Sequence, residues 1–137
     1  MNFVLDASVV LSWAFEDEGG EYAVRVLEEL RSSEAVTASL WPLEVTNGLL
    51  TAERRGRMEA AGARRFLHLL LSLPIVVDPV ARRRAFEGVH ALARTHGLTS
   101  YDAAYLELAV RYGIPIATLD EPLRAAASAE GLSMFTA

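Results

Sequence analysis

The sequence has 137 residues, a formal net charge of −5 at pH 7, no cysteine and no lysine, so that all thirteen basic residues are arginine. This composition excludes disulfide bonds, thiolate catalysis, cysteine-ligated zinc, Schiff-base chemistry and the lysine of a phosphate-binding P-loop. The length fits one domain spanning residues 1–137, and without a basic leader or an apolar run of membrane-spanning length we expect a cytoplasmic protein with no membrane partner.

Short β-branched runs alternate with longer helical patterns, and no linker, repeat or low-complexity segment separates them. In chain order, the predicted elements are a strand at Phe3–Leu5, a helix at 8–15, an acidic loop at 16–20, a helix around 22–30, a strand at Ala35–Thr37, helices at 42–55 and 58–71, a strand at Ile75–Val77, a helix from about 80 to 95, a helix from about 98 to 112, a strand at 114–117, a helix at 122–129 and a weak last strand at 133–135. This order predicts an α/β fold with a parallel sheet covered on both faces.

Four acidic residues are predicted at one edge of the sheet. Crossovers in a parallel sheet are right-handed, so ligands collect at the carboxyl ends of the strands. The acids at or just after these ends are Asp6, Glu44, Asp102 and Asp120. Each also lies at the start of a predicted helix, where acids serve as caps, so capping is an alternative for every one of them.

The capping alternative gives each acid a definite position. The two acids that directly follow strands would be N-caps, and Glu44 would occupy the third helical position after Pro42 at the first. The segment Thr99-Ser100-Tyr101-Asp102 has the form of a capping box, with Thr99 as the N-cap.

The helical wheel indicates where Asp102 points. At about 100° per residue, Asp102 lies within about 40° of Leu106 and Ala109, on the apolar side of its helix. Glu107 and Arg111 form the i,i+4 pair expected on a solvent-exposed face. An inward-facing carboxylate needs a backbone donor, a cation or a proton.

Glu44 lies on a small polar strip of its helix, which predicts a groove. It shares a face with Asn47, Gly48 and Thr51, while the core stripe consists of Val45, Leu49 and Ala52. Asn and Gly are unfavourable inside helices, which suggests a positional reason for both.

If the four carboxylates converge, their repulsion raises some of their pKa values and destabilises the site unless a cation binds. An oxygen-only ligand set suits Mg²⁺ or Mn²⁺. Such an ion activates water and neutralises charge on a phosphodiester oxygen, so the pattern indicates metal-assisted hydrolysis of a nucleic acid backbone.

Four segments, VLDASV, WPLEVTNGLL, GLTSYDAAYLELA and IATLDEPL, together resemble the motifs of PIN-domain proteins, and more narrowly the toxin ribonucleases of VapBC-type toxin–antitoxin modules. The resemblance implies a three-layer α/β/α fold with a mostly parallel central sheet of about five strands. It also implies Mg²⁺- or Mn²⁺-dependent endoribonuclease activity on RNA. Family members usually form homodimers and are inhibited by an antitoxin whose C-terminal segment lies across the active-site groove.

The resemblance assigns roles to individual residues. Asp6, Glu44, Asp102 and Asp120 match the four family acids, with Asp6 and Asp102 as the direct metal ligands. Glu44 would complete the shell of the ion with help from water, and Asp120 would hold a second ion or the attacking water.

Three further polar residues, Ser8, Asn47 and Thr118, match family positions. They would orient carboxylates or metal-bound water, with local capping or packing as the alternative.

Arginine occurs in clusters despite the acidic net charge: Arg54, Arg55 and Arg57; Arg64 and Arg65; and Arg82, Arg83 and Arg84. Any one cluster is explained by a solvated helix face. The first cluster follows the Glu44 helix, so we also expect it to contact RNA phosphates near the acidic pocket. The three histidines, His68, His90 and His96, are expected to be packing or surface residues.

The sequence also suggests two alternative functions. A non-catalytic PIN-like module that binds RNA or protein is the main alternative, although RNA binding alone does not call for four carboxylates. A phosphatase that forms an aspartyl phosphate on Asp6 is disfavoured, because the chain has no lysine and carries Ser8 where such sites have a second aspartate.

Overall fold

The computed structural model describes residues 1–15 and 20–136, so most of the predicted acidic loop, residues 16–19, lies outside the described residues. A four-stranded sheet is formed by β1 (Phe3–Leu5), β2 (Ala35–Thr37), β3 (Ile75–Val77) and β4 (Ile116–Ala117). The strand order is β3-β2-β1-β4, and every pair is parallel. The predicted parallel sheet is therefore confirmed, with β1 at its centre.

The expected fifth strand is the one part of the sheet that differs. Residues 133–135 contribute a single parallel bridge, between Ile116 and Met134. Two backbone hydrogen bonds accompany it, from the Ile116 N–H to Ser133 and from the Phe135 N–H to Ile116, at 3.2 and 2.9 Å. The sheet thus has four strands rather than about five.

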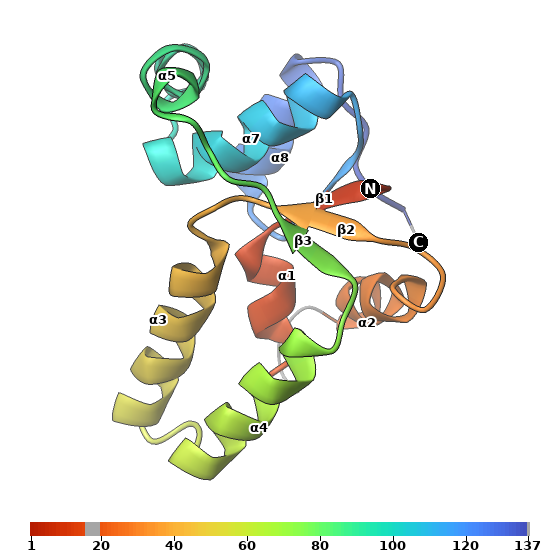
Figure 1. The fold of residues 1–137 in the computed structure, drawn as a ribbon, viewed down its shortest axis with the longest axis vertical. Coiled ribbons are helices and arrows are strands. Elements are labelled where there is room, and N and C mark those ends of the chain that lie inside the picture. The colour runs from red at the N-terminus through yellow and green to blue at the C-terminus, as the bar shows by residue number, and fades with distance from the viewer. Residues whose placement is uncertain (16–19, 137) are drawn as a thin grey trace.

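Helices cover both faces of the sheet and give the three layers of an α/β/α fold. Figure 1 shows α1 to α4 on one face and α5, α7 and α8 on the other. The helices are α1 (Ala7–Ser12), α2 (Gly20–Glu29), α3 (Trp41–Arg54), α4 (Ala60–Leu71), α5 (Arg82–Arg84), the π-helical turn η1 (Ala85–Val89), α6 (His90–His96), α7 (Ser100–Tyr112) and α8 (Glu121–Ala129). Among the described residues, no helix is long and apolar enough to cross a membrane.

The core lies where the sheet meets its two helical layers. All residues of β1 and β2 are buried, as expected for strands covered on both faces. In contrast, β3 forms one edge of the sheet, and Val76 and Val77 are 42% and 38% exposed. The central strand thus provides a rigid base, and its carboxyl end leads directly into the candidate site.

The prediction that the Glu107–Arg111 pair on α7 is solvent-exposed is wrong, because both side chains are largely buried. Arg111 Nε and Glu107 Oε1 are 3.0 Å apart, but their side chains are only 19% and 9% exposed. The segments η1 and α6 pack against this face of α7, and Gly88 lies close enough that an added Cβ would be 3.4 Å from Glu107 Cγ. Arg111 also bonds Asp78 Oδ2 at 2.8 Å, so the pair belongs to an ionic cluster between layers.

Candidate functional site

The four predicted acids line one pocket, a cavity of about 310 Å³ at the carboxyl ends of the central strands. The residues that line it are Asp6, Ala7, Ser8, Leu11, Glu44, Asn47, Gly48, Asp102 and Asp120. They come from the residue after β1, from α1, from the first two turns of α3, from the first turn of α7 and from the residue before α8. Segments up to 114 residues apart in the sequence therefore meet at this edge, whereas none of the three histidines lines the pocket.

Asp6 is held by two hydroxyl groups rather than used as a helix cap. It has the N-cap position of α1 but makes no capping hydrogen bond with its side chain. Instead Ser8 Oγ and Thr118 Oγ1 donate to its Oδ2 atom at 2.6 and 2.7 Å. Burial raises the pKa of Asp6 despite these hydrogen bonds, and the charge of Asp120 raises it further.

The same two hydroxyl groups also hold the chain that leads to Asp120. Ser8 Oγ accepts from the Leu119 N–H at 2.9 Å, and Thr118 Oγ1 accepts from the Asp120 N–H at 3.0 Å. This geometry agrees with the predicted orienting role of Ser8 and Thr118. Asn47 lines the pocket and is exposed, and within the described part of the chain it has no hydrogen bond to the acids.

Asp102 and Asp120 lie at the capped starts of helices and also line the pocket. Thr99 Oγ1 accepts from the Asp102 N–H at 3.2 Å, which confirms Thr99 as the N-cap of α7. Asp120 Oδ2 accepts from the Leu123 N–H at 3.0 Å, which confirms Asp120 as the N-cap of α8. The pKa of Asp102 is raised by burial and by the charges of Asp120 and Asp6. Capping fixes these helix starts, and both carboxylates still line the pocket.

Glu44 does not occupy the predicted third helical position. The helix α3 begins at Trp41 with Leu40 as its N-cap, so Pro42 is the second residue and Glu44 the fourth. Its Oε1 atom accepts a hydrogen bond of 2.5 Å from Tyr105 Oη. The pKa of Glu44 is raised by burial and by the charges of Asp6 and Asp102, against the effect of this hydrogen bond.

Two residues that complete the pocket escaped a functional assignment from sequence. Tyr105 is fully buried beneath Glu44, and the only signal in the sequence is that a buried tyrosine hydroxyl group needs a partner. The packing of α1 explains why a glycine, Gly48, occurs inside α3 although glycine is unfavourable there. A Cβ at this position would lie 2.7 Å from the two terminal methyl groups of Leu11, so glycine lets α1 approach α3 beside the pocket.

The donor set fits a hard divalent cation. It consists of oxygen atoms, and the pKa values of Asp6, Glu44 and Asp102 are raised first by burial and then by the charges of the neighbouring acids, both of which a bound cation would offset. Within residues 1–15 and 20–136, no three acidic or histidine side chains already form an ion-binding cluster. Mg²⁺ commonly uses one or two carboxylates and retains several waters, so a shell built on Asp6, Asp102 and water fits this arrangement.

The arginines expected near the pocket lie at the far end of α3. Arg54 is its last residue, ten positions beyond Glu44, which is about 15 Å along the helix axis. Arg55 caps the helix, and the Arg57 guanidinium group lies over the Phe15 ring, 4.3 Å from its centroid. All three arginines are exposed. In Figure 1, α3 runs away from the sheet, so these residues are remote from the acids.

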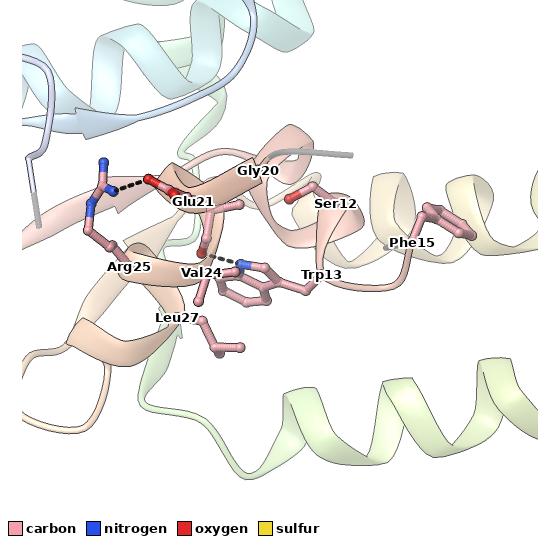
Figure 2. A pocket seen from close by; sticks show the side chains of 9 residues that line it. Ser12, Trp13, Phe15, Gly20, Glu21, Val24, Arg25 and Leu27 are labelled. Carbon is pink, nitrogen blue, oxygen red and sulfur yellow. Dashed lines mark hydrogen bonds and ion pairs between the residues drawn. The ribbon is translucent and has the colours of Figure 1, made fainter. Parts of the chain in front are cut away.

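A larger cavity, of about 710 Å³, lies between α1 and α2 (Figure 2). Its lining is mostly apolar, and the Trp13 indole N–H donates to the Ala23 carbonyl at 2.7 Å. The charged residues among its described lining, Glu21 and Arg25, form an ion pair of 3.7 Å with each other. The described part of this lining therefore lacks the converging carboxylates of the acidic pocket.

Known proteins match this chain over most of its length. The family model described as "PIN domain" matches residues 3–129. The curated protein Ribonuclease VapC3 of Pyrobaculum aerophilum is 32% identical over 123 residues, which cover 90% of this chain and 92% of the relative.

Solved structures match the fold over nearly the whole chain. The structure of PAE2754 from Pyrobaculum aerophilum has a TM-score of 0.73 and 25% identity, covering 92% of this chain and 84% of the other. Mycobacterium tuberculosis VapC20, described as a sarcin-ricin loop cleaving toxin, has a TM-score of 0.71 and 17% identity, covering 99% of this chain and 100% of the other.

Proposed function

The chain belongs to the PIN domain family, and from this premise we propose that it is an endoribonuclease that hydrolyses RNA phosphodiester bonds with Mg²⁺ or Mn²⁺. The observation that carries the proposal is the convergence of Asp6, Glu44, Asp102 and Asp120 on one pocket. A relative named as a ribonuclease at 32% identity supports the same reaction class. A pocket built only to bind RNA would not place four carboxylates where a phosphate has to enter.

In this proposal Asp6 and Asp102 hold the ion directly, and Glu44 reaches it through water. Asp120 holds the attacking water or a second ion. When bound, the ion would lower the pKa of a water molecule and offset the negative charge that builds on the phosphodiester oxygen. Ser8 and Thr118 keep the Asp6 carboxylate in one orientation, so that little reorganisation is needed when the ion binds.

The biological role that we propose is that of the toxin in a toxin–antitoxin pair, acting in the cytoplasm as a homodimer until a cognate antitoxin binds. The support is the name of the relative, Ribonuclease VapC3, together with the family motifs. Growth of cells that express the wild-type chain or Asp6→Asn tests toxicity. The product of any small upstream open reading frame with a DNA-binding N-terminus is the candidate antitoxin, and its co-purification tests the partnership.

RNA phosphates are proposed to contact Arg54, Arg55 and Arg57. Since these residues lie about 15 Å or more from Glu44 along α3, they would bind a phosphate well removed from the one that is cleaved. The substrate would then be an RNA long enough or folded enough to reach both places.

The direct experiment incubates the purified protein with total RNA in Mg²⁺, in Mn²⁺ and in EDTA, and maps the ends that appear. We expect discrete new ends with either metal and none in EDTA. RNA that is bound but remains uncut under all three conditions would instead favour the non-catalytic PIN-like module.

A further inference from the structure

We infer that Tyr105 is a positioning residue for Glu44, acting through a hydrogen bond beneath the acidic pocket. The inference rests on the proposed metal-dependent nuclease, and it adds a residue that touches neither RNA nor the ion. Tyr105 binds one carboxylate oxygen of Glu44, Oε1, and leaves Oε2 free of this hydrogen bond, so that it could accept from water held by the ion. Loss of the hydroxyl group therefore weakens ion binding without removing a ligand.

The position of Tyr105 follows from α7. This helix places Asp102 at the pocket, and Tyr105 lies three residues later, one turn further along the same face. Tyr105 is fully buried, while Glu44 is only partly so. The 2.5 Å hydrogen bond crosses from α7 to α3, between residues 61 positions apart. One helix thus controls two of the four carboxylates, one as its own residue and the other through Tyr105.

A second buried hydroxyl group, that of Thr37 at the carboxyl end of β2, lies beside the Tyr105 hydroxyl group. Thr37 Oγ1 donates to the Leu5 carbonyl at 2.8 Å, so its proton is committed to β1. The proton of Tyr105 is committed to Glu44, which accepts it at 2.5 Å.

Tyr105 remains a hydrogen-bond donor throughout the ordinary pH range. Burial, the hydrogen bond to Glu44 and the charge of Glu44 raise the pKa of Tyr105 far above its usual value. The phenol therefore keeps its proton, and its single O–H is committed to Glu44. A short hydrogen bond between a neutral donor and a carboxylate is stronger than one between neutral groups, so it restricts the carboxylate effectively.

The competing explanation is that Glu44 merely satisfies a buried hydroxyl group. Both explanations predict that Tyr105→Phe alters stability, because each involves the same hydrogen bond. Only the positioning role predicts that Mn²⁺ binding depends on the Tyr105 hydroxyl group and that this dependence disappears when Glu44 is replaced. Mn²⁺ affinity therefore separates the two.

The experiment measures the Kd of Mn²⁺ alone, by electron paramagnetic resonance and calorimetry, for the wild type, Tyr105→Phe, Glu44→Gln and the double variant. We expect Tyr105→Phe to weaken Mn²⁺ binding by about 10-fold in the wild-type background and by less than about 2-fold in the Glu44→Gln background. In RNA cleavage with saturating metal, kcat should fall while KM stays near the wild-type value.

Tyr112→Phe is the matched control, because it removes a tyrosine hydroxyl group that donates to Asp78 Oδ1 at 2.9 Å on the same helix but outside the pocket. It should leave the Mn²⁺ Kd unchanged. Glu44→Gln is a second test that does not depend on the folding of Tyr105→Phe, and it should weaken Mn²⁺ binding at least as much, because Tyr105 acts only through Glu44.

Wild-type Mn²⁺ affinity in Tyr105→Phe or in Glu44→Gln overturns the inference, as does an equal loss on adding Tyr105→Phe to the Glu44→Gln background. Failure of the proposed function looks different, because the wild type itself would then show no Mn²⁺-dependent cleavage of RNA.

Discussion

Thr118 and Asp6 lie 112 positions apart in the sequence, yet the Thr118 hydroxyl group donates a 2.7 Å hydrogen bond to Asp6 Oδ2. Parallel pairing of β1 with β4 makes this contact possible, since Leu5 lies opposite Ala117 and the next residue in each chain segment is Asp6 or Thr118. The Asp6 N–H also donates to the Ala117 carbonyl at 3.0 Å. The register of the central strands therefore determines the geometry of the acidic pocket.

Replacing Thr118 by valine should loosen this geometry. The valine keeps the volume of a fully buried side chain but removes the donor to Asp6 and the acceptor for the Asp120 N–H. We expect metal affinity to fall by about 10- to 100-fold, the usual effect of losing a residue that orients a ligand. Calorimetry with Mn²⁺ provides the measurement. Thr118→Ser keeps the hydroxyl group and should remain near wild type, and equal loss in both variants would indicate that packing rather than hydrogen bonding matters.

Asp6→Asn should stabilise the metal-free protein. The pKa of Asp6 is raised in the folded state, so the folded protein holds a proton that the unfolded chain releases above its ordinary value near 3.8. The contribution of Asp6 to stability is therefore fully present below that pH and is lost as the pH rises through its folded pKa. At pH 7 in EDTA the variant should melt a few degrees higher, about 4 °C for each kcal/mol of relieved repulsion.

Thermal unfolding from pH 4 to 8 in EDTA checks the Asp6→Asn prediction through the difference between the two proteins. Their midpoints should diverge as the pH rises. A variant that melts well below the wild type at every pH would show that the Asp6 carboxylate is chiefly a structural group.

Arg111 should matter for stability rather than for cleavage. It bonds both Asp78 and Glu107, and its replacement by glutamine leaves the largely buried Asp78 without its ion-pair partner and Glu107 with only the longer contact to Arg84, at 3.4 Å. We expect a loss of about 3 kcal/mol, near the lower end for a broken buried ion pair. Urea unfolding at pH 7 gives the value, and an unchanged midpoint would show that the cluster contributes nothing net.

The same cluster predicts acid sensitivity. Burial acts to raise the pKa of Asp78, but hydrogen bonds from Arg111 and Tyr112 outweigh it and lower the pKa below 3.8. This contribution is present above pH 4 and is lost as the pH falls through the folded pKa. Arg111→Gln should therefore flatten the acid limb of the stability curve, which circular dichroism from pH 2 to 5 would show.

Arg54 and Arg55 should bind RNA phosphates without affecting the chemical step. Replacing both by alanine should weaken RNA binding and reduce the slope of log Kd against log salt by about 0.7 for each lost contact with a single strand. Filter binding of RNA at several salt concentrations measures the slope. All proteins in this assay also carry Asp102→Asn, so that the RNA is not cleaved. Arg31→Ala is the control, because this exposed arginine precedes β2 and lies toward the opposite edge of the sheet. Equal slopes for all three proteins would remove these arginines from the RNA-binding surface.

Much of the fold was predictable from local patterns. Strand positions followed from short buried β-branched runs, and the alternation with helices implied a parallel sheet. The meeting of the four acids followed from one geometric rule, that ligands collect at the carboxyl ends of parallel strands. The inward direction of Asp102 followed from the helical wheel and agrees with its place in the pocket.

The features that escaped prediction depend on contacts between distant segments. A helical wheel shows that Glu107 and Arg111 share a face, but only the packing of η1 against α7 shows that this face is covered. The partner of Tyr105 lies 61 positions away, and no local pattern connects it to Glu44. The distance of Arg54 from the pocket depends on the direction of α3, which the linear sequence does not give.

The most direct measurement is the single-turnover rate of RNA cleavage in Mg²⁺ by the wild type and by Asp102→Asn, with folding of both checked by thermal unfolding. Asparagine keeps the volume of the side chain and the N–H that is capped by Thr99, but removes a carboxylate assigned to the ion. The account predicts a folded variant whose rate falls by more than about 100-fold, beyond the loss typical of residues that only orient a ligand. A folded variant that cleaves RNA at the wild-type rate would contradict it.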